Sequence, residues 1–304
     1  MTIRVFLGIA RAAFLPASVL PFLVGAAYAR YTGAVIRPAL LLLGLAGVSC
    51  AHLGGNLFND YFDHKSGADE LHPRPSVFFG GSRAIQDGVV SPGYVLAAAA
   101  AFLSAALLFG SVIILAVPGP VIPMFMLAGG TIAVAYTAPP LKLAYRRLGE
   151  AAIFICFGIF LSLGGYAVFA GPLTADVVLV SLPVAFLVLG VIVCNEIPDS
   201  PFDSAAGKKN LVGLLGRGNG YVLYGASVAL SACSLIFIIL RGVVPACSFL
   251  VLPLYLAGLK AARLLKTGYD DTGSAVKASG MTVALHGAVG VVMVFILWVA
   301  NVSG

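Results

Sequence analysis

Two clusters of asparagine and aspartate are the part of this sequence best suited to chemistry. Each has an asparagine followed, at helical spacing, by two aspartates: Asn56, Asp60 and Asp63 in the first cluster, and Asn195, Asp199 and Asp203 in the second. Residues three or four positions apart share one face of a helix, so the side chains of each cluster are expected to project together. Pro198 and Pro201 interrupt the second cluster, and Asp203 is therefore expected to reach the site from a loop.

Aspartates gathered in this way need a cation. Carboxylates close together repel one another, and each aspartate inside a membrane costs about 2.5–3.5 kcal/mol on insertion scales. Hard oxygen ligands suit Mg²⁺, which is typically held by a few carboxylates together with substrate phosphate oxygens. We therefore expect Asp60, Asp63, Asp199 and Asp203 to be catalytic metal ligands, with a diphosphate bridging two Mg²⁺ ions. Helix capping or pairing with a lysine explains a single aspartate better than it explains this doubled pattern.

The composition places these clusters in a membrane protein. Of the 304 residues, 60% are hydrophobic and 10% are charged, and the mean hydropathy is +1.04. Soluble domains carry roughly 25% charged residues. One membrane-embedded domain over residues 1–304 is expected. The five cysteines lack metal-ligand spacing and the basic residues form no run, which argues against zinc sites and against nucleic acid as a partner.

Apolar runs predict an all-α bundle of about nine transmembrane helices around a central cavity. Each run is long enough to cross a hydrocarbon core of about 30 Å. The predicted spans are 13–32, 38–63, 92–115, 120–137, 148–169, 176–198, 219–240, 244–265 and 279–300. With nine spans, both clusters lie at the same side of the membrane, and the two termini lie on opposite sides.

The charged residues predict the orientation. Fifteen of the 18 basic residues lie in the N-terminus or in the connections after the second, fourth, sixth and eighth spans, and the other three are Arg30, Arg37 and Arg241. The positive-inside bias predicts a multi-pass plasma-membrane protein with a cytoplasmic N-terminus and an external C-terminus. Of the 12 acidic residues, all but Asp176 fall on the cytoplasmic side. We therefore expect the chemistry at the cytoplasmic mouth of the bundle.

The two clusters also resemble a known family. The aspartate-rich motifs of the UbiA family of intramembrane prenyltransferases are similar to NLFNDYFDHKSGAD and NEIPDSPFDSAAGKKNLVGLLG. The family's menaquinone branch, the 1,4-dihydroxy-2-naphthoate polyprenyltransferases, resembles this chain at GGSRAIQDGVVSP and YTAPPLKLAYRRLGE. That branch usually has Asn-Asn-x-Arg-Asp where this chain reads Asn-Glu-Ile-Pro-Asp from Asn195, and this departure leaves the acceptor open.

The resemblance implies a Mg²⁺-dependent prenyltransferase. Such an enzyme transfers a polyprenyl group from a prenyl diphosphate to an aromatic acceptor, here 1,4-dihydroxy-2-naphthoate, in menaquinone biosynthesis. The cluster residues become the metal and diphosphate site of a cavity that opens sideways to lipid. Diphosphate leaves the allylic carbon, and the electron-rich ring then attacks the carbocation while water is kept out.

Six further residues are candidates for contact with the substrates. They are Lys142, Arg146 and Lys208 for the diphosphate, Tyr136 and Tyr145 for the cavity wall, and Arg83 for the acceptor's carboxylate. Cations beside a leaving diphosphate add to its neutralisation, and aromatic ring faces shield a carbocation. Positive-inside placement, the interfacial aromatic belt and loop solvation explain these residues about equally well. Asp69, next to the first cluster, is expected to be a supporting loop residue.

Two other interpretations stay open at this point. Another acceptor, such as 4-hydroxybenzoate, a dihydroxynaphthoate isomer or a glycerol phosphate lipid, fits the same diphosphate site. A secondary transporter also has polar helix ends around a central cavity. A transporter is expected to carry charges near the membrane midplane, whereas the acidic residues here lie at one face.

Overall fold

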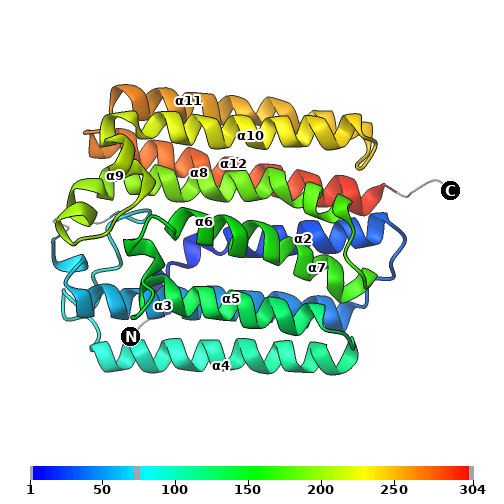
Figure 1. Ribbon diagram of the computed structural model, residues 1–304, viewed down its shortest axis with the longest axis horizontal. Coiled ribbons are helices and arrows are strands. Elements are labelled where there is room, and N and C mark those ends of the chain that lie inside the picture. The colour runs from blue at the N-terminus through cyan, green and yellow to red at the C-terminus, as the bar shows by residue number, and fades with distance from the viewer. Residues whose placement is uncertain (1–2, 72–75, 301–304) are drawn as a thin grey trace.

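In the computed structural model, which describes residues 3–71 and 76–300, long helices lie side by side along one axis (Figure 1). The first half of the chain forms α1 (Ile3–Ile9), η1 (Ala12–Phe14), α2 (Pro16–Tyr31), α3 (Pro38–Ser66), η2 (Asp69–Leu71), α4 (Pro92–Ala116), α5 (Val121–Thr137) and η3 (Leu143–Tyr145). The second half forms α6 (Gly149–Ile153), η4 (Phe154–Phe160), α7 (Leu161–Ala170), α8 (Ala175–Ala205), α9 (Leu211–Leu215), η5 (Arg217–Asn219), α10 (Gly220–Leu240), η6 (Ala246–Leu254), α11 (Tyr255–Thr267) and α12 (Thr272–Val299).

These helices confirm the predicted all-α membrane fold. Among the described residues, eight helical segments are long and apolar enough to cross a membrane. The remaining predicted span, 120–137, the fourth along the chain, is α5, a shorter apolar helix of 17 residues. The span predicted at 148–169 is one continuous rod made of α6, η4 and α7, in which η4 is a π-helix. The last span begins at Thr272, seven residues before the predicted start, because the Asp271 side chain caps it by accepting a hydrogen bond from the Ser274 amide.

The prediction that Asp203 lies in a loop is wrong. Helix α8 continues through Pro198 and Pro201 to Ala205 and carries Asp203 on its last turns. A proline inside a helix leaves the carbonyl four residues earlier without its usual donor. The carbonyl four residues before Pro201 is that of Ile197, and Arg217 Nε donates to it at 2.9 Å. This side-chain bond replaces the missing backbone bond, so the helix is not forced to end.

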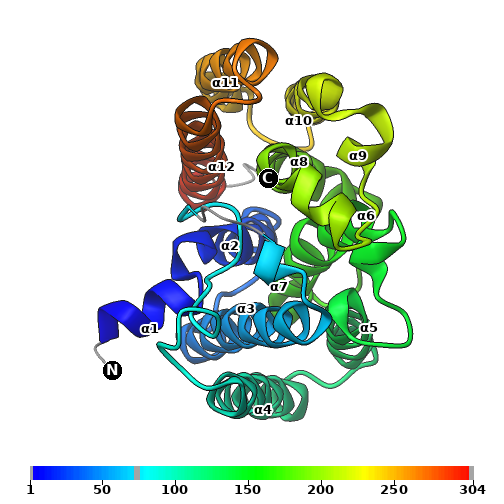
Figure 2. The same ribbon diagram turned by 90° about the vertical axis from the view of Figure 1, so that its left-hand side faces the viewer.

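Glycine allows the central helices to approach closely. Helix α2 packs against α7 on one side and α12 on the other, and α8 packs against α10 and α12. A Cβ atom at Gly25 of α2 would collide with the Ser162 carbonyl, and one at Gly165 of α7 would collide with the Phe22 carbonyl. The backbones of α2 and α7 are therefore in direct contact, which holds α2 fixed at the middle of the bundle (Figure 2).

Both aspartate clusters lie at one end of the bundle, which we call the motif end. It holds the C-terminal turns of α3 and α8 together with the segments 67–71, 76–91 and 206–219, at the left of Figure 1. Figure 2 looks onto this end, where the segment 76–91 crosses in front of α2 and α3, and Phe78 of this segment lies near Gly280 of α12. The predicted parity, with the two clusters on the same side, is confirmed.

Candidate active site

The first cluster occupies the last turns of α3. Asp60 and Asp63 are each only 3% exposed, although they lie close to the helix end. The helix stops at Ser66 because Gly67 adopts a left-handed conformation, with φ of 77°, and its amide closes the last turn. Two carboxylates are therefore buried at a helix terminus, where they need positive partners.

Arg11 is the partner of Asp60, and the sequence analysis did not select it. Its Nη2 atom lies 2.7 Å from Asp60 Oδ1, 49 residues away in sequence. The backbone of Arg11 is left-handed, with φ of 51°, an uncommon conformation for a residue other than glycine. This turn separates α1 from η1 and directs the guanidinium toward α3. Asn56 fixes the same segment, because its Nδ2 donates to the Ala10 carbonyl at 3.1 Å.

Lys208 joins the two clusters. Its Nζ atom lies 2.8 Å from Asp63 Oδ2 on α3 and 3.8 Å from Asp203 Oδ1 on α8. The chain turns at Gly207, with φ of 79°, so Lys208 points back toward the helix ends. Asn210 also donates to Asp203 Oδ2, at 3.1 Å. Lys208 thus contacts both halves of the predicted site.

The carboxylates keep both cations charged. Burial alone would lower the pKa of Arg11, but Asp60, Asp69, Asp63 and Asp199 together hold the pKa of its guanidinium above the ordinary value. Burial would likewise lower the pKa of Lys208, but Asp63 and Asp203 raise it well above the ordinary value. Residues of both clusters therefore act on Arg11, which shows that the clusters face each other at the motif end.

A loop that we call the strap, residues 79–83, covers the site. The Gly80 amide donates to Asp199 Oδ2 at 3.2 Å, and Arg83 Nη1 donates to the Asp69 carbonyl at 3.2 Å. Arg83 also forms an ion pair with Asp87 at 3.4 Å. Burial, reinforced by the carboxylates of Asp63 and Asp60, raises the pKa of Asp69 to about 7. The strap therefore contacts both Asp69, which follows the first cluster in the sequence, and Asp199 of the second cluster.

Gly81 gives a test of this strap. Its φ is +72°, and a Cβ atom there would lie 2.9 Å from Asp69 Oδ1. We expect Gly81→Ala to lower the free energy of unfolding by about 1–3 kcal/mol and to reduce turnover, because the strap must shift away from Asp69. Thermal unfolding and initial rates measure the two effects.

Gly88→Ala is the matched control. Gly88 has a similar φ of +67°, but no atom lies within 4 Å of the position of its Cβ. Its substitution carries the backbone strain without the steric contact, so it should cost less stability and leave turnover near that of the parent protein. Equal losses in the two variants would contradict a specific role for the Asp69 contact.

Tyr145 extends the site on the α5–α6 side. Its hydroxyl donates to Asp63 Oδ1 at 3.2 Å and lies 2.7 Å from Ser66 Oγ. The Nζ atoms of Lys142 and Lys208 lie 4.9 and 5.7 Å from its ring centroid. Burial, followed by the charge of Asp63, raises the pKa of Tyr145 to about 12. The structure thus brings Lys142, Tyr145 and Lys208 together.

Other predicted residues lie further from this centre. Arg146 is exposed and donates to the Pro140 carbonyl at 3.0 Å. The oxygen of the Asn195 amide accepts a hydrogen bond at 3.0 Å from Ser279 on α12, so this asparagine tethers α8 to α12. Tyr136 is partly buried, and its hydroxyl packs near Gly149 at the start of α6.

Two glutamates also escaped the sequence analysis. Glu150 is 1% exposed, and one of its carboxylate oxygens accepts a hydrogen bond from the Leu211 amide. Glu150 and Glu196 interact with each other through their side chains, and each has an Oε2 atom that is buried without a hydrogen-bond partner. Glu196 lies one helical turn before Asp199, and this spacing is the signal that would have pointed to it.

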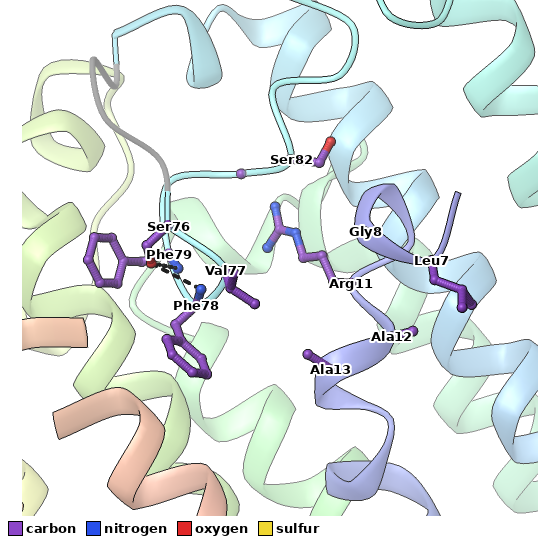
Figure 3. A pocket seen from close by; sticks show the side chains of 11 residues that line it. Leu7, Gly8, Arg11, Ala12, Ala13, Ser76, Val77, Phe78, Phe79 and Ser82 are labelled. Carbon is purple, nitrogen blue, oxygen red and sulfur yellow. Dashed lines mark hydrogen bonds between the residues drawn. The ribbon is translucent and has the colours of Figure 1, made fainter. Parts of the chain in front are cut away.

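A cavity of about 490 Å³ opens beside Arg11. Figure 3 shows the guanidinium of Arg11 between the strap and the α1–η1 turn, with Ser82 above it and Phe78 pointing away below. Apolar side chains of Leu7, Val77 and Phe79 form much of the remaining wall. The cavity therefore combines one partly buried cation next to Asp60 with an apolar lining.

Comparison with known proteins identifies the family. The profile of the UbiA prenyltransferase family matches residues 18–286. The 1,4-dihydroxy-2-naphthoate octaprenyltransferase of Bacillus subtilis (strain 168) is 31% identical over 230 residues, which cover 75% of this chain and 71% of the relative. This chain belongs to the UbiA prenyltransferase family. The expectation of a prenyltransferase is thereby confirmed, and the transporter interpretation is not supported.

More distant UbiA proteins share the sequence or the fold. The mouse UbiA prenyltransferase domain-containing protein 1 is 31% identical over 221 residues, which cover 68% of this chain but 60% of the mouse protein. A solved UbiA homologue from Archaeoglobus fulgidus, bound to GPP and Mg²⁺, superimposes with a TM-score of 0.67 over 96% of this chain and 100% of its own. At 18% identity, that likeness concerns the fold alone.

Proposed function

We propose that this UbiA protein transfers a polyprenyl group from a prenyl diphosphate to 1,4-dihydroxy-2-naphthoate with the help of Mg²⁺. The observation that carries the proposal is the meeting of both aspartate clusters around Arg11 and Lys208 at one end of the bundle. Carboxylates and cations alternate there, as a site for a metal-bound diphosphate requires. The naphthoate acceptor rests on the similarity to the Bacillus subtilis enzyme.

The aspartates supply part of a ligand set for Mg²⁺, which phosphate oxygens of the substrate would complete. Asp60 Oδ2 is buried and has no hydrogen-bond partner, so a hard oxygen atom is left over for a cation. Asp60, Asp63, Asp199 and Asp203 would hold the metal, which we expect as two ions. When bound, Mg²⁺ would supply charge stabilisation for the departing diphosphate.

The protein's own residues have the remaining tasks. Arg11, Lys142 and Lys208 carry the positive charge that a diphosphate needs as it leaves. The Tyr145 ring lies within 6 Å of the Nζ atoms of Lys142 and Lys208, and its hydroxyl donates a hydrogen bond to Asp63. The strap over Asp69 and Asp199 covers the site from the aqueous side and limits the access of water.

The acceptor is tested by assaying a matrix of acceptors against prenyl diphosphates, with product mass as the readout. We expect 1,4-dihydroxy-2-naphthoate to be prenylated by purified protein. Turnover of 4-hydroxybenzoate or a glycerol phosphate lipid with no turnover of naphthoates would refute the acceptor assignment. The diphosphate site would be unaffected by that outcome, because the acceptor and the diphosphate are varied independently.

Orientation is a further prediction. Because 15 of the 18 basic residues are on one side of the predicted topology, the motif end should face the cytoplasm. In a cysteine-free background, a membrane-impermeant thiol reagent added outside cells should label a cysteine at position 303 but not one at position 76. Labelling in the opposite pattern would reverse the assigned orientation.

A further inference from the structure

Three of the four cluster aspartates, Asp60, Asp63 and Asp203, already lie within 4 Å of a cation of the protein itself. Arg11 pairs with Asp60 at 2.7 Å, and Lys208 pairs with Asp63 at 2.8 Å and approaches Asp203 at 3.8 Å. The side chains of Asp60 and Asp63 are 3% and 4% exposed, whereas those of Arg11 and Lys208 are 24% and 15% exposed. The carboxylates are therefore shielded from water, while the two cations are partly buried. Each pair engages carboxylate oxygens that a metal ion would need.

The protein alone offers little to a metal. Among residues 3–71 and 76–300, no three His, Cys, Asp or Glu side chains are close enough together to hold a metal ion. A metal entering alone would also lie beside two partly buried cations and would deprive Arg11 or Lys208 of its partner. Loss of the partner of a partly buried charge is unfavourable. A diphosphate changes both conditions, because it supplies oxygens to the metal and negative charge to the two cations.

We propose that Arg11 and Lys208 are exchangeable counterions, which pair with the aspartates in the free protein and transfer to the diphosphate when it binds. Mg²⁺ and the prenyl diphosphate then depend on each other for binding: each binds weakly alone and more tightly when the other is present. This inference rests on the proposed function and adds to it how the site is loaded.

Both cations are positioned for such a transfer. Arg11 lies at a left-handed turn outside the long helices, and its Nε atom is buried without a hydrogen-bond partner. Its guanidinium borders the cavity of about 490 Å³ (Figure 3). Lys208 follows Gly207 in the segment between α8 and α9. Either side chain can therefore change partner by rotation, while α3 and α8 stay in place.

The test is a set of Mg²⁺ titrations followed by thermal unfolding of the purified full chain. They are run with Mg²⁺ alone and with a fixed amount of a non-hydrolysable geranyl diphosphate analogue. For the parent protein we expect no rise in Tm with Mg²⁺ alone, and an apparent Mg²⁺ affinity at least ~10-fold higher when the analogue is present. In Arg11→Met, Mg²⁺ alone should raise Tm, because Asp60 is freed, and the dependence on the analogue should shrink.

Two controls isolate the role of the charge. Arg11→Lys keeps a cation at the site and should keep most of the coupling. Arg241→Met removes a different arginine, an exposed one that follows α10 and packs over the Phe237 ring, and should behave like the parent protein. If Arg11→Met does not fold, the same titrations are made with Lys208→Met, because Lys208 contacts both clusters. Its coupling between Mg²⁺ and the analogue should then be the one that shrinks.

The outcomes separate the two proposals. Stabilisation of the parent protein by Mg²⁺ alone, with the same affinity as in the presence of the analogue, would overturn the counterion exchange but leave the prenyl diphosphate site intact. Unchanged coupling in the folded Arg11 and Lys208 variants would also overturn it. If Mg²⁺ and the analogue together failed to raise Tm, the proposed function would fail, and the counterion exchange with it.

Discussion

Asp60→Asn and Asp199→Asn should each reduce kcat by at least ~10²-fold, although the two residues lie on different helices. A departing diphosphate carries high negative charge, and the aspartates of both clusters are proposed to hold the cations that stabilise it. Stabilisation of this kind is stronger in the transition state than in the ground state, so its loss lowers kcat. The asparagine amide keeps the size of aspartate and can still accept the hydrogen bond from Arg11 or from the Gly80 amide.

Asp60→Asn leaves Arg11 without a charged partner at 2.7 Å, so a lower Tm is expected for this variant although repulsion among the carboxylates is relieved. In Asp199→Asn the relief of repulsion should keep Tm within a few degrees of the parent value, and kcat is compared at a temperature where both variants are folded. Asp270→Asn is the matched control. Asp270 pairs with Arg217, but its side chain is 66% exposed and outside the cavity, so its loss should leave kcat near the parent value. Near-normal turnover in either cluster variant would refute the two-cluster mechanism.

The helices were predictable because lipid imposes a simple rule on sequence. A backbone inside the bilayer must satisfy its own hydrogen bonds, so each long apolar run has to be a helix. Every predicted span corresponds to a helix in the structure. The clusters on α3 and α8 were found for a related reason, since carboxylates at helical spacing stand out against an apolar background.

The path of α8 was not predictable from local rules. Pro198 and Pro201 normally end a helix, and the sequence around them gives no reason for it to continue. The reason is a tertiary contact, because Arg217 Nε reaches the Ile197 carbonyl from 20 residues further along the chain. Asp203 consequently lies on the helix, where it approaches Lys208.

Arg11 was missed because its role depends on backbone geometry. In the sequence it is one basic residue among several before the first span, where the positive-inside rule accounts for it. Its left-handed φ of 51° turns the side chain toward α3, and the Asn56 bond to Ala10 holds that turn. Neither feature leaves a pattern in the sequence. The Gly80 amide at Asp199 escaped for the same reason, since a backbone donor has no side-chain signature.

Removal of divalent metal should stop turnover, and restoring Mg²⁺ should recover it. We expect exhaustive chelation to lower the rate by at least ~10²-fold, because the charge of the leaving diphosphate would then be met by Arg11, Lys142 and Lys208 without a divalent ion. Ca²⁺ should restore less activity than Mg²⁺, since it takes more ligands at longer distances than the octahedral geometry of Mg²⁺. Initial rates in metal-buffered detergent solution measure these effects.

The Mg²⁺ concentration needed for turnover should depend on the concentration of prenyl diphosphate. No three acidic, histidine or cysteine side chains in the described part of the chain form a ready metal site, so oxygens of the prenyl diphosphate must complete it. A higher concentration of prenyl diphosphate should therefore lower the free Mg²⁺ needed for half-maximal rate. Asp270→Asn should show the same relation as the parent protein, because Asp270 is outside the site. Undiminished turnover after chelation would rule out metal-assisted departure of the diphosphate. If the Mg²⁺ concentration for half-maximal rate did not change with the substrate concentration, the aspartates would bind the metal by themselves.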